Sequence, residues 1–162
     1  MEIQISQMIT RKNSVLFVLF SVLVTILSSC GEKAYYDDVY SFDGQQWEKS
    51  DTAVFTVPVE DTTNRFQFNI SLRTTTDYAY SNLWVYILST APDGSTSKVA
   101  QKLPLARPDG SWIGNVSGTV VQTEVRFAAK HFPLKGDYTF QFLNATQQES
   151  IDNILDIGLR VR

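Results

Sequence analysis

Cysteine and histidine are almost absent from this chain of 162 residues, which contains one of each, Cys30 and His131. A single cysteine cannot form a disulfide within the chain, so the fold has to be held together by its hydrophobic core. A zinc site or a Ser-His-Asp triad would have to be built around His131, which we expect at a strand end or turn. Phosphate-loop, G-x-S-x-G and H-E-x-x-H motifs are missing as well. The sequence therefore predicts neither an enzyme nor a cofactor or metal site.

Basic residues are also scarce and scattered. Removing the two basic and one acidic residues of positions 1–29 from the 14 and 17 of the whole chain leaves a formal charge near −4. Nucleic-acid-binding proteins concentrate Lys and Arg on one face or in one stretch, and here no basic cluster exceeds two residues. The charge pattern excludes a nucleic-acid partner.

The chain does contain one long apolar run, at positions 15–27, which follows Arg11 and Lys12. It is shorter than the roughly 20 residues that a membrane-spanning helix needs, and its basic flank is typical of a secretory signal. The tetrad LSSC at positions 27–30 resembles the lipobox of bacterial lipoproteins, in which the cysteine thiol receives a diacylglycerol and becomes the first mature residue. We therefore expect lipidation of Cys30. An uncleaved anchor helix is the alternative.

This assignment predicts three parts. Residues 1–29 are a lipoprotein signal peptide that is removed, residues 30–38 are a lipidated N-terminus and tether, and residues 39–162 form one domain. Two or more acyl chains such as palmitate hold a protein durably on a membrane. Gly31 follows Cys30, so the Asp that retains some lipoproteins at the inner membrane is missing. We expect an outer-membrane lipoprotein, with its domain in the periplasm or at the cell surface.

The domain shows the two-residue period of β-strands. At positions 65–73, Phe and aliphatic residues alternate with polar ones, which predicts a strand with one buried face. Pro58 within 53–59 predicts an edge strand. The segment 82–89 is apolar on both faces, so we expect a central strand with Trp84 in the core. Further strands are expected at 39–42, 98–106, 112–127, 138–143 and 154–161.

About eight short strands separated by Gly, Pro and Asp turns predict an all-β fold, an antiparallel β-sandwich of jelly-roll type. A small closed barrel has the same periodicity and stays open as the alternative.

Several segments together resemble the gliding-motility lipoprotein family GldH. Besides the lipobox, they are DYAYSNLWVYILSTAPDG (77–94), DGSWIG (109–114), GDYTF (136–140) and DIGLRV (156–161). The resemblance implies a lipid-anchored envelope protein that supports gliding motility and the linked protein secretion machinery, with other envelope proteins as partners. It implies no enzymatic activity, and only Cys30 carries over as a functional position.

Two kinds of binding function compete on the residues themselves. Aromatic side chains are enriched at binding hot spots, and those expected at the surface could contact a protein partner. A glycan-binding lipoprotein is the alternative, because aromatic residues of β-sandwiches can present platforms for sugars. The expected surface residues for either partner are Tyr35, Tyr36, Tyr78, Tyr80 and Trp112.

Two further possibilities concern acidic and hydroxyl residues. A glycosidase would need two carboxylates about 5 to 9 Å apart. The acids available are also those that turns require, namely Glu60, Asp61, Asp77, Asp109, Asp152 and Asp156. Asp51-Thr52-Ala53 and Asp61-Thr62-Thr63 resemble an O-glycosylation pattern, which marks Thr52 and Thr62 as candidate sites.

Overall fold

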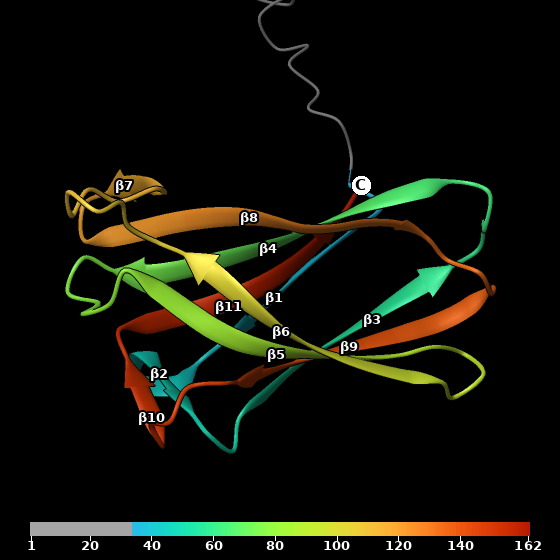
Figure 1. Cartoon of the computed structure of the whole chain (residues 1–162), viewed down its shortest axis with the longest axis horizontal. Helices are drawn as coiled ribbons and strands as arrows, with labels where there is room; N and C mark the ends of the chain where they lie inside the picture. Colours follow the sequence, from blue (N-terminus) through green and yellow to red (C-terminus); the bar gives the residue numbers. More distant parts are fainter. Residues whose placement is uncertain (1–33) are drawn as a thin grey trace, which may run out of the picture. The chain divides into compact units, whose positions relative to one another are not determined.

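Residues 34–162 form mainly β-strands joined by turns and loops in a computed structural model, which describes this part of the chain (Figure 1). The expected signal peptide, the lipidation site Cys30 and the first part of the tether lie outside the described residues. Residues 34–162 form one compact unit. Within them no helix is long and apolar enough to cross a membrane.

Eleven strands are present among the described residues, and they form two main sheets and a small one. The five-stranded sheet has, in spatial order, β1 (Tyr36–Ser41), β11 (Ile154–Val161), β4 (Arg65–Thr75), β8 (Val120–His131) and β7 (Asn115–Ser117). The four-stranded sheet has β3 (Thr52–Val59), β9 (Gly136–Asn144), β5 (Asn82–Thr90) and β6 (Thr96–Pro104). A short 3-10 turn (Asp43–Gln45) leads into the small sheet of β2 (Gln46–Glu48) and β10 (Ser150–Asp152).

The expected jelly-roll sandwich is present. All registered pairs are antiparallel, and the first long strand pairs with the last, β1 with β11. The next pairs are β3 with β9, β4 with β8 and β5 with β6. This nested pairing of eight long strands, distributed over two sheets, is the double Greek key of a jelly roll. Neither sheet closes into a barrel.

The core lies between the two main sheets, where the inward positions of most of the long strands are apolar. β4 buries Phe66, Phe68, Ile70 and Leu72 as its alternation predicts. β3 is an edge strand, as expected from Pro58. Each inward side chain of this kind contributes about 1.5–3 kcal/mol when it is fully buried, so the fold is stable without a disulfide. The other buried faces are those of β3, β5, β9 and β11 (Ala53, Phe55, Val57, Leu83, Val85, Ile87, Tyr138, Phe140, Phe142, Ile157, Leu159 and Val161).

Three details differ from the sequence-based expectations. β1 begins at Tyr36, so the last part of the expected tether is a strand, because its backbone pairs with the end of β11. Trp84 is not in the core: 43% of its surface is exposed, since the outer face of β5 is uncovered. The expected strand at 112–127 is instead the short β7 and the long β8, separated by a turn at Gly118 with φ of 59°.

A candidate aromatic binding surface

Two adjoining hollows, of about 480 Å³ and 240 Å³, lie where β5 begins and β6 ends. Both are lined by Tyr78 and Tyr80. The larger is completed by the 106–112 segment with Arg107 and Trp112, and the smaller by Asn82, Trp84, Thr146 and Gln148. We call this combined feature the aromatic cleft. It brings together three of the five aromatic residues expected at a binding surface.

Tyr78 and Tyr80 form the shared wall of the cleft. Their rings meet edge to face, with centroids 5.7 Å apart. Tyr78 was expected to be exposed but is buried, and its hydroxyl donates to the carbonyl of Asn82 at 3.2 Å. This burial raises the pKa of Tyr78 above its usual value, so the residue stays neutral. Tyr80 is 49% exposed and therefore presents its ring to the hollow.

Trp84 and Gln148 border the smaller hollow on its other side. The Gln148 amide nitrogen donates to the Tyr80 hydroxyl at 2.7 Å, which links the 145–149 loop to the cleft. Asn144 holds that loop, because its Oδ1 accepts from the backbone N–H of Thr146 at 2.8 Å. Together the two hollows thus combine exposed aromatic rings with side-chain amides.

Trp112 is half-buried and is held by backbone contacts at the rim of the larger hollow. It forms an isolated antiparallel bridge with Ala106, and its carbonyl accepts from Arg107 Nη1 at 2.8 Å. The intervening turn is closed by Asp109, whose carboxylate accepts from the backbone N–H of Ser111 at 2.9 Å. The side-chain and backbone hydrogen bonds from Ser111 lower the pKa of Asp109, so its negative charge is retained in the turn.

Gly114 determines how closely the chain that follows Trp112 approaches β8. A Cβ at Gly114 would lie 2.3 Å from the carbonyl oxygen of Gln122 and 2.5 Å from Thr123 Oγ1. Real side chains do not approach a backbone oxygen so closely, so only glycine lets the segment pack directly against β8. The sequence shows a glycine at the end of the DGSWIG segment, but the close packing that requires it is visible only in the structure.

Tyr35 and Tyr36 are not part of the cleft. Tyr35 packs on Phe66 with ring centroids 4.9 Å apart, and its hydroxyl donates to the Pro58 carbonyl at 2.6 Å. Tyr36 is partly buried against the core, and its hydroxyl donates to Asp38 at 3.2 Å. Burial, followed by the charge of Asp38, raises the pKa of Tyr36 to about 12. Both tyrosines link the first strand to the sandwich.

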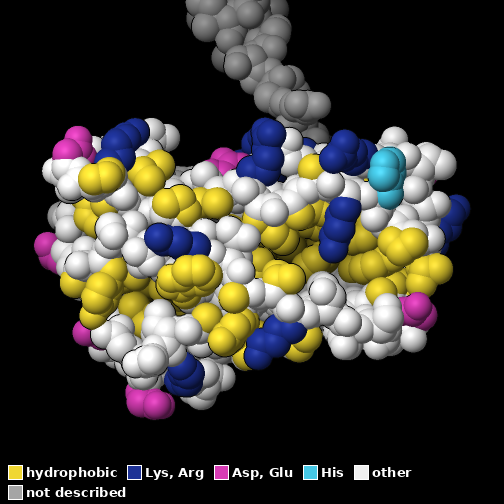
Figure 2. All heavy atoms as spheres, viewed as in Figure 1, with side chains coloured by type: hydrophobic (Ala, Val, Ile, Leu, Met, Phe, Trp, Pro, Cys, Tyr) yellow, Lys and Arg dark blue, Asp and Glu magenta, His cyan; other side chains and the backbone are white. Residues whose placement is uncertain are grey.

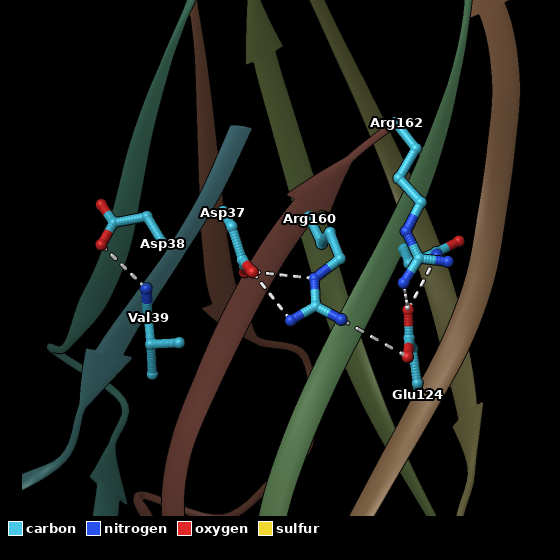
Figure 3. Close-up of polar contacts among 7 residues, drawn as sticks. Asp37, Asp38, Val39, Glu124, Arg160 and Arg162 are labelled. Atoms are coloured by element: carbon cyan, nitrogen blue, oxygen red, sulfur yellow. Dashed lines mark hydrogen bonds and ion pairs between the residues drawn. The ribbon is translucent and has the colours of Figure 1, made fainter. Parts of the chain in front are cut away.

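The outer face of the five-stranded sheet is polar, in contrast to the cleft. Figure 3 shows Arg160 of β11 between the carboxylates of Asp37 and Glu124, with Nε 2.9 Å from Asp37 Oδ2. Arg162 Nη2 lies 3.9 Å from Glu124 Oε1. Opposite charges on β1, β11 and β8 pair with one another here, so this part of the face is an ion-pair network rather than a site of one sign.

Four of the six acids considered for glycosidase chemistry accept hydrogen bonds from other residues, namely Asp61, Asp109, Asp152 and Asp156. The residues that line the cleft include neither Asp nor Glu. Asp156 is buried and paired with Arg73 on the outer face of the other sheet. Asp61 accepts from the backbone N–H of Thr63 at 2.8 Å, and Asp152 accepts from Gln46 at 2.8 Å. Among residues 34–162, no group of three His, Cys, Asp or Glu side chains could hold a metal ion.

The remaining predicted positions are easily located. His131 is exposed at the last position of β8, the strand end where it was expected. Thr52 is half-buried at the start of β3, and Thr62 is half-buried in the loop that follows it. O-glycosylation of these two residues stays a prediction.

Sequence reasoning missed Trp84, Arg107 and Gln148. Trp84 and Tyr86 share one parity of the 82–89 segment, whereas Leu83, Val85 and Ile87 share the other. Tyrosine and tryptophan combine an apolar ring with a polar atom, and they often lie where one end is wet. The alternation of these two aromatic residues with aliphatic ones was the sequence signal that the outer face of this strand is exposed. Arg107 and Gln148 carried none, because only tertiary contacts bring their loops to the cleft.

The strand pairing and the cleft define a jelly-roll domain with an aromatic cleft at one end of its four-stranded sheet. The sequence model of the family described as "GldH lipoprotein" matches residues 34–161, and the chain belongs to this family. It is 27% identical to the "Gliding motility lipoprotein GldH" of Flavobacterium johnsoniae over 157 residues, covering 93% of this chain and 96% of that protein. It is 25% identical to the "Gliding motility lipoprotein GldH homolog" of Christiangramia forsetii over 156 residues, covering 91% and 94%. The family assignment made from the sequence segments is thereby confirmed.

Solved structures resemble the domain only distantly. An exo-β-1,3-galactanase from Phanerochaete chrysosporium, solved with β-1,3-galactotriose, aligns with a TM-score of 0.40 and 13% identity. The alignment covers 82% of this chain and 27% of the galactanase.

Proposed function

We propose that this chain is a lipid-anchored, non-catalytic binding protein of the gliding motility machinery, and that it holds a protein component of that machinery in the aromatic cleft. Membership of the GldH family gives the chain a role in gliding motility and places it among membrane-anchored envelope proteins. The outer membrane, the anchor on Cys30 and the mode of action are the proposed parts.

The observation that supports binding is the exposure of large aromatic residues around a hollow without acids. Trp84 and Tyr80 are each more than two-fifths exposed, although their burial would stabilise the isolated domain. Exposed aromatic residues at a concave surface are typical of protein-binding hot spots. Arg107, at the rim, adds a guanidinium that can donate to carbonyl or carboxylate oxygens of a partner.

Glycan binding is the second candidate, and one observation favours it. Trp84 and Trp112 border adjoining hollows, with the amides of Asn82 and Gln148 beside them. Planar rings cover the apolar face of a sugar, and amides can hydrogen-bond its hydroxyl groups. The same residues would therefore bind a saccharide without any change of the fold.

The experiment replaces the native gene of a gliding host with genes for single variants. Trp84→Ala and Tyr80→Ala remove cleft aromatics, and Val54→Ala is the matched control, because Val54 is a similarly exposed apolar residue on β3 of the same sheet. We expect both cleft variants to reach normal abundance and to lose most of the gliding speed, while Val54→Ala glides normally. Normal gliding of both cleft variants would overturn the proposal.

Two controls separate the finer parts of the proposal. Retention of the protein on a polysaccharide column, lost in Trp84→Ala, would favour the glycan candidate over a protein partner. The Cys30→Ala variant should be lost from the outer-membrane fraction. The intact mass of the protein that keeps Cys30 should include the mass of the lipid. Hexose additions in the same spectrum, lost in Thr52→Ala or Thr62→Ala, would establish the predicted O-glycosylation.

A further inference from the structure

β6 is the edge strand of the four-stranded sheet and pairs with β5 alone among the described strands. It extends from Thr96 to Pro104, and it crosses the front of the molecule in Figure 1. An open edge of this length presents backbone donors and acceptors that can pair with another chain.

The register shows which backbone groups are free. At the two ends of the β5–β6 pair, Leu105 N–H donates to the Ser81 carbonyl and Ala91 N–H donates to the Ser95 carbonyl, each at 2.8 Å. In an antiparallel pair such bonds recur at every second residue. The odd-numbered residues of β6 therefore bond to β5. The even-numbered residues direct their backbone groups outward, so Lys98 and Ala100 offer free N–H and C=O groups. Lys102 offers its N–H, while its carbonyl accepts from Gln101 Nε2 at 2.9 Å.

The side chains along this edge divide by charge and polarity. Lys98 and Lys102 lie on the outer face, opposite Leu88 and Trp84 of β5, with Ala100 between them. Lys98 Nζ is 4.1 Å from the centroid of the Tyr86 ring. Val99 lies on the inner face and is 48% exposed, because no described strand covers this edge. In Figure 2, hydrophobic side chains form a band across this side of the molecule with basic side chains among them.

We propose that β6 binds an extended acidic segment of a partner protein as a fifth strand of its sheet. The segment has carboxylates four residues apart, facing Lys98 and Lys102, and apolar residues on its other face that cover Val99. Strand addition of this kind derives its affinity from backbone hydrogen bonds and its specificity from alternate side chains. The site adjoins the aromatic cleft, because Lys102 pairs with Trp84 of β5, but none of its own residues lines the cleft. It rests on the proposed function only in that the domain works by binding proteins.

Charge argues against a second copy of this chain as the occupant. Antiparallel pairing of two β6 strands centred on Ala100 would place each Lys98 opposite a Lys102, and parallel pairing in register would place each lysine opposite itself. Like charges directly opposite on paired strands are destabilising. Opposed carboxylates remove this repulsion and form cross-strand ion pairs instead.

The test uses the full-length protein in detergent micelles and a fluorescent peptide of sequence TEVTVET. This peptide alternates apolar and polar residues and has its two glutamates four residues apart. The control peptide TKVTVKT has lysines in their place. Fluorescence anisotropy gives the dissociation constant, and hydrogen–deuterium exchange locates the bound segment. We expect binding of the glutamate peptide, slower exchange of residues 96–104, and binding of the lysine peptide that is at least about tenfold weaker.

Two variants decide whether β6 is the binding edge. Ala100→Pro removes an outward N–H without removing a bond to β5, and the double variant Lys98→Glu with Lys102→Glu reverses the charge. Each should weaken binding of the glutamate peptide by about tenfold or more, whereas Lys135→Glu, an exposed reversal outside β6, should not. If the Ala100→Pro variant does not fold, the charge-reversal variant alone tests whether β6 is the binding edge. An unchanged melting temperature then shows that the charge-reversal variant is folded.

Four outcomes would overturn the proposal: no binding of the glutamate peptide, equal binding of both peptides, slowed exchange away from β6, or self-association that Ala100→Pro abolishes. Trp112→Ala separates this proposal from the proposed function, because it alters the cleft and leaves the β6 edge intact. Gliding defects of the cleft variants with normal peptide binding would support the cleft alone, and the reverse would support β6 alone.

Discussion

Arg73 and Asp156 face each other on neighbouring strands of the five-stranded sheet, and the Arg73 Nε donates to Asp156 Oδ2 at 2.7 Å. The Asp156 side chain is almost fully buried, whereas the Arg73 side chain is about half exposed. The hydrogen bond and the charge of Asp156 raise the pKa of Arg73. The guanidinium therefore covers the carboxylate from the solvent side and stays charged at any physiological pH.

Removal of this cover should destabilise the domain. Arg73→Ala leaves the buried carboxylate without its charged partner, and we expect a loss of about 1–3 kcal/mol in the free energy of unfolding. Asp156→Asn with Arg73→Ala should cost less than the sum of the single changes, because the charge that needs a partner is gone. Urea unfolding of the four proteins in the cycle measures the coupling. Strictly additive losses would show that the two residues act independently.

Gly114→Ala should displace the segment that presents Trp112. The added Cβ would lie 2.3 Å from the Gln122 carbonyl oxygen, so the backbone must move or the short β7–β8 pairing must open. We expect a loss of about 1–3 kcal/mol and a shift in Trp112 fluorescence, as for other over-packed positions. Ser117→Ala, at an exposed position of β7, is the control and should change neither quantity. An unchanged spectrum and stability in Gly114→Ala would contradict the close packing.

Tyr36 should make the domain sensitive to alkali. Its pKa is about 12 in the folded protein and about 10 in an unfolded chain, because burial and the charge of Asp38 disfavour the phenolate. The stabilisation is complete below pH of about 10 and is lost as the pH rises toward about 12. Tyr36→Phe should therefore flatten the decline of stability in this window. Equal slopes of the two proteins in urea unfolding at stepped pH would rule out this contribution.

The fold was predictable from the sequence because one face of most strands is buried. Pro58 also indicated the edge position of β3, since proline has no backbone N–H to donate to a neighbouring strand. The alternation failed for β5, where Trp84 and Tyr86 are apolar but point outward. Aromatic residues occur both in protein cores and at binding surfaces, so hydrophobicity alone cannot distinguish a buried position from an exposed one.

The candidate site was predictable only in part. Tyr80 and Trp112 were identified from their residue type, but Tyr35 and Tyr36 have the same type and lie at the β1 end of the sandwich. Which aromatic residues meet depends on the jelly-roll pairing, which brings the loops after β4, β6 and β9 together. The free edge of β6 likewise follows from strand order, which periodicity does not encode.

The pairing of β1 with β11 has a mechanical consequence. β1 is the first strand after the predicted anchor, and it is held by six registered pairs from Tyr36 to Ser41. Its first residues lie beside the start of β4, where Tyr35 packs on Phe66, whereas the aromatic cleft follows the end of β4. In the proposed arrangement, with a lipid anchor before β1 and a partner bound in the cleft, tension between the two would act along β1. Such a load would shear the six β1–β11 pairs together rather than peel them apart one by one.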